Sequence, residues 1–200
     1  LDMSLGAQNV YFEKEGAFTG EISVNMLKSC SVQYVIIGHS ERRHIFNESN
    51  KDTNRKIHTV LDNEIIPIFC VGEKLDDRES NNTRTILLEQ LEEGLAGVNI
   101  DALDRIIIAY EPVWAIGTGV NALPNQVQES HKMIRDILME LYDNNLNIDI
   151  PILYGGSVKP DNSEELINTK GVDGFLIGGA SLNLDTFSKI IEIVHSKFMR

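Results

Sequence analysis

Two side chains that could transfer protons each follow a short apolar run of the chain. The carboxylate of Glu111 comes directly after the run 106–110, and the imidazole of His39 comes directly after the run 32–38. A carboxylate can remove a proton from a carbon next to a carbonyl group, and an imidazole can donate a hydrogen bond to that carbonyl. Such a pair could carry out acid–base chemistry on a carbonyl compound, with Glu111 as the candidate general base. A lone Glu is more often part of a surface ion pair and a lone His more often a core residue, so this interpretation depends on the flanking motifs.

The segment that follows this carboxylate has the composition of a lid. Pro112 would stiffen its start, and Trp114 and Ile116 could seal a site against water. Gly117 and Gly119 permit backbone conformations that other residues rarely adopt, so the loop could move. The alternative is a merely ordered loop. The expected lid runs from Pro112 to Ala122 and includes Val113, Trp114, Ala115, Ile116, Thr118 and Gly119.

The imidazole of His39 precedes a stretch that we expect to form a short helix, Ser40–Arg43. The positive end of a helix dipole disfavours the charged imidazolium. We therefore expect His39 to be neutral and to act as a hydrogen-bond donor. The other four histidines lie in or beside stretches with a helical pattern and are interpreted as structural or solvated.

The net charge of −12 excludes some classes of partner. Nucleic acid and anionic membranes both reward Lys and Arg, so neither is expected to bind. A small phosphorylated substrate remains possible because backbone N–H groups and helix N-termini bind phosphate without basic side chains. A bare Gly-Gly pair is more often a turn, but here Gly-Gly-Ser and Gly-Gly-Ala follow two successive strands. The expected phosphate-binding groups are the backbone N–H groups of Gly117, Ser157, Gly178 and Gly179.

Composition also bounds the cell compartment. The two cysteines, Cys30 and Cys70, do not form a disulfide framework, which favours a reducing compartment such as the cytoplasm. No run approaches the roughly 18 apolar residues of a membrane helix. The first residues lack a basic stretch followed by an apolar core, so no signal peptide is expected.

Apolar runs alternate with helical patterns along the whole chain, which predicts a parallel α/β sheet built from right-handed βαβ units. We expect one domain over residues 1–200, with chemical groups at the ends of many successive strands. That distribution is typical of a (β/α)8 barrel, whereas an open doubly wound sheet concentrates such groups at one switch point. The predicted strands are 5–10, 32–38, 65–71, 106–110, 152–154 and 174–177. The clearest predicted helices are three: one covers 81–97, one begins near Pro124 and carries an apolar stripe over 134–141, and one carries an apolar stripe over 187–198.

Four motifs together resemble the triosephosphate isomerase family. They are Tyr34–Arg43, Ala109–Gly119, Tyr154–Ser157 and the pair Gly178-Gly179, and the resemblance runs from the first residues to the last. It implies a TIM (β/α)8 barrel, of which this chain carries about six βα units. The family's pattern places two further units before residue 1, together with an Asn-x-Lys motif whose lysine is catalytic. Asn-x-Lys also occurs here at 54–56 and 168–170, but both lie in or beside expected helices, so neither is accepted as that lysine.

The resemblance also implies the reaction and several supporting roles. The reaction would interconvert dihydroxyacetone phosphate and glyceraldehyde 3-phosphate, in glycolysis and gluconeogenesis, with no cofactor and no metal. Glu41 would support the catalytic groups by pairing with the lysine that this chain lacks. The loop with Thr19, Gly20 and Glu21 would insert into a neighbouring subunit of a homodimer. That interface would be supported by Asn9 and Arg42, whereas Cys70 and Glu73 would be architectural. The lid would end in Val120-Asn121-Ala122, where the family usually has Lys-Thr-Ala.

Two alternatives to this interpretation stay open at the level of sequence. Another phosphate-binding barrel enzyme, such as a sugar-phosphate isomerase or lyase, would share the glycine-rich phosphate loops without the Glu-Pro-Val-Trp lid. A catalytically inactive protein that binds ligands or partners is favoured by the missing lysine. The absent units would also leave two strand edges unpaired, so we expect the 200 residues alone to be poorly soluble and, without the lysine, essentially inactive.

Overall fold

The structure is a computed structural model that describes residues 3–116, 121–142 and 150–199. Six parallel strands form one sheet in chain order, β1-β2-β3-β4-β5-β6. Every strand pairs with the next one along the chain, as expected for successive βαβ units. All six lie within the predicted apolar runs, although most are shorter. The strands are β1 (Gly6–Ala7), β2 (Tyr34–Ile37), β3 (Ile66–Val71), β4 (Ile107–Tyr110), β5 (Ile152–Tyr154) and β6 (Gly174–Phe175).

Helices separate the strands and cover the sheet. The α-helices are α1 (Val24–Ser29), α2 (Ser40–His44), α3 (Asn50–Leu61), α4 (Leu75–Glu79), α5 (Thr83–Gly94), α6 (Pro124–Leu141), α7 (Pro160–Ile167) and α8 (Leu184–Phe198). Three short 3-10 helices are η1 (Ile100–Arg105), η2 (Val113–Ala115) and η3 (Gly179–Leu182).

Local sequence explains where the longer helices begin. Ser49 and Asp52 form a reciprocal capping box at the start of α3, which satisfies backbone N–H groups that the first turn leaves unpaired. Pro124 occupies the first turn of α6, where its missing N–H costs nothing. The predicted stripe of α6 is buried at Ile134, Ile137 and Leu138. These signals are local, so the sequence reveals them directly.

The last helix is only partly buried. Of the stripe on α8, only Ile190 is buried, while Phe198 is 61% exposed. Among the described residues, α8 packs mainly on α7 and η3, which cover one side of it. The stripe is therefore amphipathic as predicted but only partly covered.

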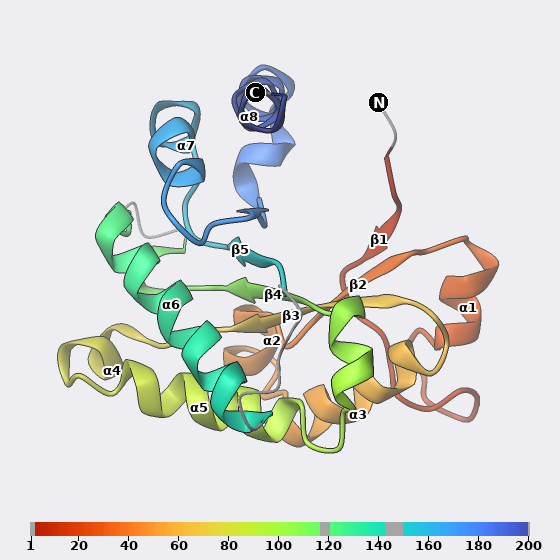
Figure 1. Cartoon of the computed structure of the whole chain (residues 1–200). Helices are drawn as coiled ribbons and strands as arrows, with labels where there is room; N and C mark the ends of the chain where they lie inside the picture. The colour runs from red at the N-terminus through yellow and green to blue at the C-terminus, as the bar shows by residue number, and fades with distance from the viewer. Residues whose placement is uncertain (1–2, 117–120, 143–149, 200) are drawn as a thin grey trace.

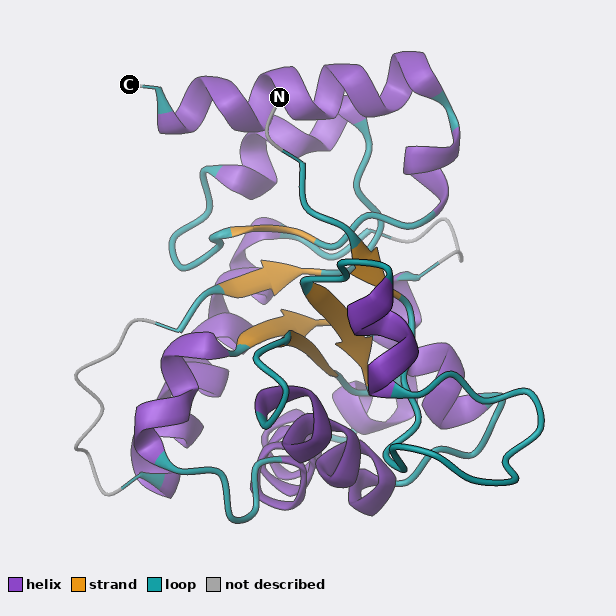
Figure 2. Ribbon diagram, turned by 90° about the vertical axis from the view of Figure 1, so that its right-hand side faces the viewer, coloured by secondary structure: helices purple, strands orange, loops and turns teal. Residues whose placement is uncertain are grey.

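Figure 1 shows the sheet as a curled layer with α3, α5 and α6 along one side and α7 beside α8 at the other end. Figure 2, turned by 90°, shows the strands at the centre with helices around them. One contiguous core joins side chains from the strands to those of the surrounding helices. This arrangement brings the carboxyl ends of the strands, and the residues that follow them, to one edge of the sheet.

Candidate active site

A cavity of about 950 Å³ opens where the carboxyl ends of the strands meet. Parallel strands in consecutive order bring the loops after β2, β4, β5 and β6 together, although these loops are far apart in sequence. The cavity is lined by His39, Glu41, Glu111, Ile116, Ser157, Gly178 and Gly179 among others, so it gathers most of the predicted site residues.

The carboxylate of Glu111 is buried at the floor of this site and is 2% exposed. One of its oxygens, Oε1, lies 2.9 Å from His39 Nε2. The other, Oε2, accepts a hydrogen bond of 2.8 Å from the backbone N–H of Ser40. A buried carboxylate needs such donors because it has lost its water. The predicted base and the predicted carbonyl-polarising group are thus in direct contact.

Two glycines make room for Glu111. A Cβ atom on Gly72 would lie 1.8 Å from the Glu111 carbonyl oxygen, and one on Gly155 would lie 2.9 Å from Glu111 Cγ. Both distances are shorter than packed atoms tolerate, so any side chain here would push the carboxylate out of place. Glycine at the ends of β3 and β5 is therefore a condition for the geometry of the site.

The hydrogen bonds of His39 define its tautomer. Its Nδ1 accepts a 3.3 Å hydrogen bond from the backbone N–H of Glu41 at the start of α2, so Nδ1 carries no proton. The neutral ring therefore carries its proton on Nε2, and this N–H donates a hydrogen bond to Glu111. The expectation that the helix dipole would lower the pKa of His39 is wrong. The hydrogen bond with Glu111 raises this pKa above 6.5 against the opposing effect of burial.

Glu41 lies at the rim of the cavity. Its side chain is 66% exposed, and its Oε2 is 3.9 Å from His39 Nδ1. At that distance and exposure the contact is weak. The nearest described carboxylate to the reactive ring is therefore Glu111, with Glu41 as a more distant second.

Glu73 anchors the start of the expected lid. Its carboxylate is fully buried and accepts hydrogen bonds from Tyr110 Oη at 3.0 Å and Trp114 Nε1 at 3.0 Å. Arg78 adds a contact of 3.2 Å to the same carboxylate. Sequence reasoning treated Glu73 as architectural, and the contacts connect this architecture to the loop that begins at Pro112. The lid residues Gly117, Thr118 and Gly119 lie outside the described residues.

Ser157 contacts the same loop rather than an open space. Its hydroxyl donates to the Ala115 carbonyl at 2.8 Å, and its backbone N–H donates to the same oxygen at 3.1 Å. The predicted phosphate-binding N–H of Ser157 is therefore engaged in this structure. Gly178 and Gly179 are exposed at the cavity and begin η3, and a Cβ atom on either would meet nothing within 4 Å.

Neither lysine of the two Asn-x-Lys triplets is among the residues that line the cavity. Lys56 is buried on α3, where its ammonium contacts Glu48 at 2.5 Å and Asn9 at 2.9 Å. Lys170 is exposed just beyond α7. Among the described lining residues, Arg42 and Lys159 carry the positive charges.

The loop with Thr19, Gly20 and Glu21 projects from the rest of the chain. All three residues are exposed, and the loop protrudes near α3 at the lower right of Figure 1. The helix that follows begins at Val24 with Ser23 as its N-cap, so the Thr-Gly-Glu triplet is not the start of a helix. Within the chain, Asn9 contacts Lys56 and Arg42 contacts Glu48.

Sequence reasoning missed three contributions to the site. These are the backbone N–H of Ser40 and the two close approaches at Gly72 and Gly155. Glycines directly after predicted strands were a usable signal for the latter two. The first had no signal, because residues 40 and 111 are distant in sequence and meet only through strand pairing. Within the described residues, no group of three or more His, Cys, Asp or Glu side chains could hold a metal ion, and no helix is long and apolar enough to cross a membrane.

Comparisons with known proteins agree on one family. The triosephosphate isomerase family model matches residues 1–194. A protein from Fusobacterium nucleatum named triosephosphate isomerase is 47% identical over 191 residues, which cover 96% of this chain and 76% of the relative. Proteins of the same name from Dictyoglomus turgidum and Ruthia magnifica are 49% and 50% identical over 190 residues, which cover 95% of this chain and 76% of each relative.

Proposed function

Because the chain belongs to the triosephosphate isomerase family, we propose that it interconverts dihydroxyacetone phosphate and glyceraldehyde 3-phosphate, a step of glycolysis and gluconeogenesis. The single observation that carries this proposal is the contact of 2.9 Å between Glu111 and His39 in the cavity. A base and a carbonyl-polarising donor side by side are what isomerisation through an enediolate requires.

Glu111 would move the proton between two carbons of the substrate. Its carboxylate takes a proton from the carbon next to the carbonyl, the C–H electron pair forms the C=C bond, and the C=O π pair moves onto the carbonyl oxygen to give the enediolate. The same carboxyl group then returns the proton to the neighbouring carbon, while the hydroxyl proton passes from one oxygen to the other and the new C=O bond forms at the first carbon. In the resting structure both carboxylate oxygens are occupied, by Ser40 N–H and by His39, so Glu111 must leave this position to react.

His39 would polarise the substrate carbonyl. Its Nε2–H now donates to Glu111, and the same proton would be donated to the substrate oxygen once Glu111 moves. Because Nδ1 accepts from the Glu41 N–H, the ring is held in the tautomer that can donate from Nε2. A preorganised donor of this kind stabilises the negative charge that develops on oxygen.

The phosphate group would be held by backbone N–H groups of Gly117, Ser157, Gly178 and Gly179. Two of them, Gly178 and Gly179, lie exposed at the cavity with space around each Cα. Ser157 would join them only after its N–H releases the Ala115 carbonyl. Phosphate binding would therefore be coupled to movement of the lid.

We further propose that the complete protein is a cytoplasmic homodimer. In each subunit, residues 1–200 and the two preceding units of the family's pattern would form one barrel domain. The exposed loop with Thr19, Gly20 and Glu21 would reach the partner subunit, and Glu41 would pair with the family's lysine. Neither a cofactor nor a metal enters the proposed reaction.

A fusion protein provides the test. It joins to Leu1 the N-terminal segment of the Fusobacterium nucleatum relative, which is expected to supply two strand–helix units and the Asn-x-Lys motif. We call this protein the fusion. In D2O, NMR of the product should show deuterium on the carbon that receives the proton, and Glu111→Gln should abolish both turnover and labelling. A cleaved product would favour a lyase, and a folded fusion without turnover would favour a protein that only binds ligands.

A further inference from the structure

The short segment 38–40 determines how Glu111 is held. Its His39 and Ser40 supply both donors to the carboxylate, at 2.9 and 2.8 Å. Gly38 precedes them with φ of +72°, a left-handed conformation that glycine adopts without steric cost. A small rotation of this turn would move both donors together, so the turn needs an anchor.

Arg43 contacts this turn from behind. Its Nε donates a 2.7 Å hydrogen bond to the Gly38 carbonyl. Its two terminal nitrogens donate to Asn50 Oδ1 at 2.5 Å and to the Cys70 carbonyl at 3.2 Å. One planar guanidinium therefore ties the end of β2 to β3 and to the first residue of α3.

The fit around Arg43 is tight. A Cβ atom on Gly38 would lie 2.8 Å from an Arg43 nitrogen. Burial lowers the pKa of Arg43, while the charges of Glu48 and Glu111 act in the opposite direction. A partly buried guanidinium needs partners for its donors, and here each of its three nitrogens has an acceptor.

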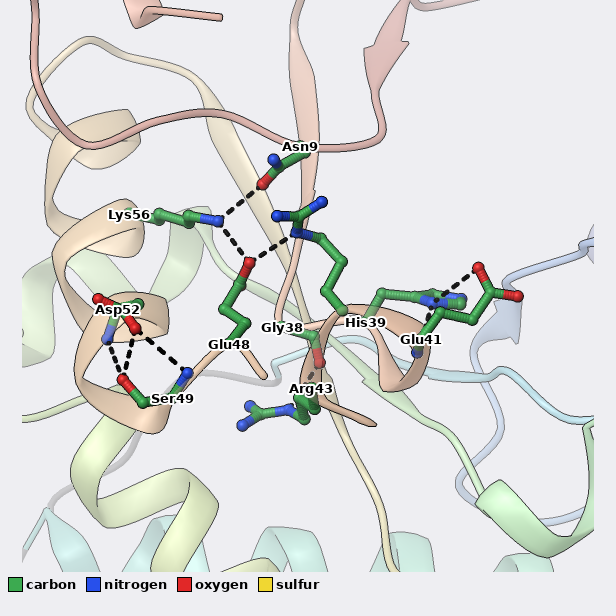
Figure 3. Close-up of polar contacts among 10 residues, drawn as sticks. Asn9, Gly38, His39, Glu41, Arg43, Glu48, Ser49, Asp52 and Lys56 are labelled. Atoms are coloured by element: carbon green, nitrogen blue, oxygen red, sulfur yellow. Dashed lines mark hydrogen bonds and ion pairs between the residues drawn. The ribbon is translucent and has the colours of Figure 1, made fainter. Parts of the chain in front are cut away.

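The neighbouring Arg42 is directed elsewhere. It contacts Glu48 at 2.6 Å, in a network with Lys56 and Asn9. In Figure 3, Arg43 extends away from His39 and Glu41 toward the side on which Ser49 lies, whereas Glu48, Lys56 and Asn9 form a separate group. Of the two arginines, Arg43 is the one bonded to the backbone directly before His39.

We propose that Arg43 is a positioning residue, which orients the turn 38–40 so that His39 and the Ser40 N–H meet Glu111. The proposal rests on the proposed roles of His39 and Glu111. Arg43 does not line the 950 Å³ cavity, so it acts through the turn and not by touching substrate. Lysine cannot replace it, because a single ammonium cannot reach three acceptors in a plane.

Arg43→Lys in the fusion tests the proposal while preserving charge. We expect kcat to fall about 10- to 100-fold, since a displacement of about 1 Å has a cost of that order. KM should change little, because the cavity lining is intact. Arg105→Lys is the matched control, since Arg105 also donates to a backbone carbonyl, that of Leu61, and should leave kcat unchanged.

NMR titration of His39 supplies a readout that a loss of stability alone would not move. In the parent, contact with Glu111 holds the pKa of His39 above 6.5, with Glu41 adding a smaller effect in the same direction. Displacing the turn weakens this contact, so Arg43→Lys should bring the pKa of His39 back toward 6.5. Asn50→Ala, which removes one acceptor of Arg43, should give a smaller shift in the same direction if Arg43→Lys fails to fold.

The two readouts separate this proposal from the proposed function. A shifted His39 titration in a fusion that lacks turnover would support the positioning role and refute the isomerase. The positioning role would be overturned if Arg43→Lys folds and changes neither kcat nor the His39 titration. If Arg43→Lys does not fold, an unchanged His39 titration in Asn50→Ala would overturn it.

Discussion

At the scale of single residues, the site is a buried carboxylate held by two donors from one short turn. Glu111 takes one hydrogen bond from a side chain and one from the backbone, and it has space only because Gly72 and Gly155 lack side chains. A base held in this way is preorganised, yet its donors must release it before it can react. Small changes in reach should therefore affect turnover more than binding.

Shortening the base tests this reasoning. Glu111→Asp in the fusion should lower kcat on the order of 100-fold, because the shorter side chain retreats from the carbon acid by about 1 Å. KM should change much less, since the phosphate loops are untouched. Steady-state kinetics of the two proteins measures both values, and equal kcat would remove Glu111 as the base.

The phosphate loop can be tested by adding a side chain to it. A Cβ atom on Gly178 meets nothing within 4 Å, but its φ of −90° with ψ of −110° is a combination that residues other than glycine rarely adopt. Gly178→Val in the fusion should therefore strain this turn locally while its side chain obstructs the approach of an anion. Calorimetry with a phosphate-containing substrate analogue should show weaker binding, at least tenfold. Unchanged affinity in a folded variant would exclude Gly178 from the phosphate site.

At the scale of elements, α6 carries a histidine buried in neutral form. His131 is fully buried, its Nδ1 lies 2.8 Å from the Gly171 carbonyl, and its Nε2 has no partner within the described structure. Burial lowers its pKa from 6.5 to about 4. Protonation would place an uncompensated charge between α6 and the segment that follows α7.

The sign of the resulting pH dependence follows from linkage. The folded pKa lies below the unfolded value, so the contribution of His131 to stability is complete above pH 6.5 and is lost as the pH falls toward about 4. The loss amounts to roughly 3 kcal/mol at about 1.4 kcal/mol per pH unit. Urea unfolding of the fusion and of His131→Phe, from pH 7 to pH 4, should show this extra loss only in the parent. Parallel curves for the two proteins would contradict the assignment.

Local signals allowed prediction of most elements and of the residues at strand ends. The apolar runs before His39 and Glu111 form β2 and β4, and Pro124 begins α6, because each depends on neighbouring residues alone. Two features could not be predicted from local sequence: the hydrogen bond from Ser40 N–H to Glu111 and the contacts of Arg43. Predicting them would require the register of β2, β3 and β4. The dipole argument for His39 failed for the same reason, since it omitted a carboxylate from a distant strand.

At the scale of the whole molecule, the sheet has two edges in the described structure. β1 pairs only with β2, and β6 pairs only with β5. Large apolar side chains near them face solvent, including Met3 at 87% exposed and Leu184 at 79%. Unpaired strand edges next to exposed apolar surface favour association between chains.

A polypeptide of these 200 residues alone should therefore self-associate and show essentially no isomerase activity. The fusion, with both edges covered, should be a homodimer that binds less of a hydrophobic dye. Light scattering after size exclusion and dye fluorescence compare the two proteins directly. A monodisperse 200-residue chain with low dye binding would show that the open edges do not control association.

The most direct test of the account is turnover by the fusion prepared in a host without its own triosephosphate isomerase. The supplied segment contains neither Glu111 nor His39, so activity that depends on Glu111 must come from this chain. We predict conversion of glyceraldehyde 3-phosphate to dihydroxyacetone phosphate by the fusion. We also predict a loss of at least about 100-fold in kcat for Glu111→Gln, because removing a general base costs on the order of 100- to 10,000-fold. A folded, dimeric fusion without turnover, or a Glu111→Gln variant as active as its parent, would contradict the account.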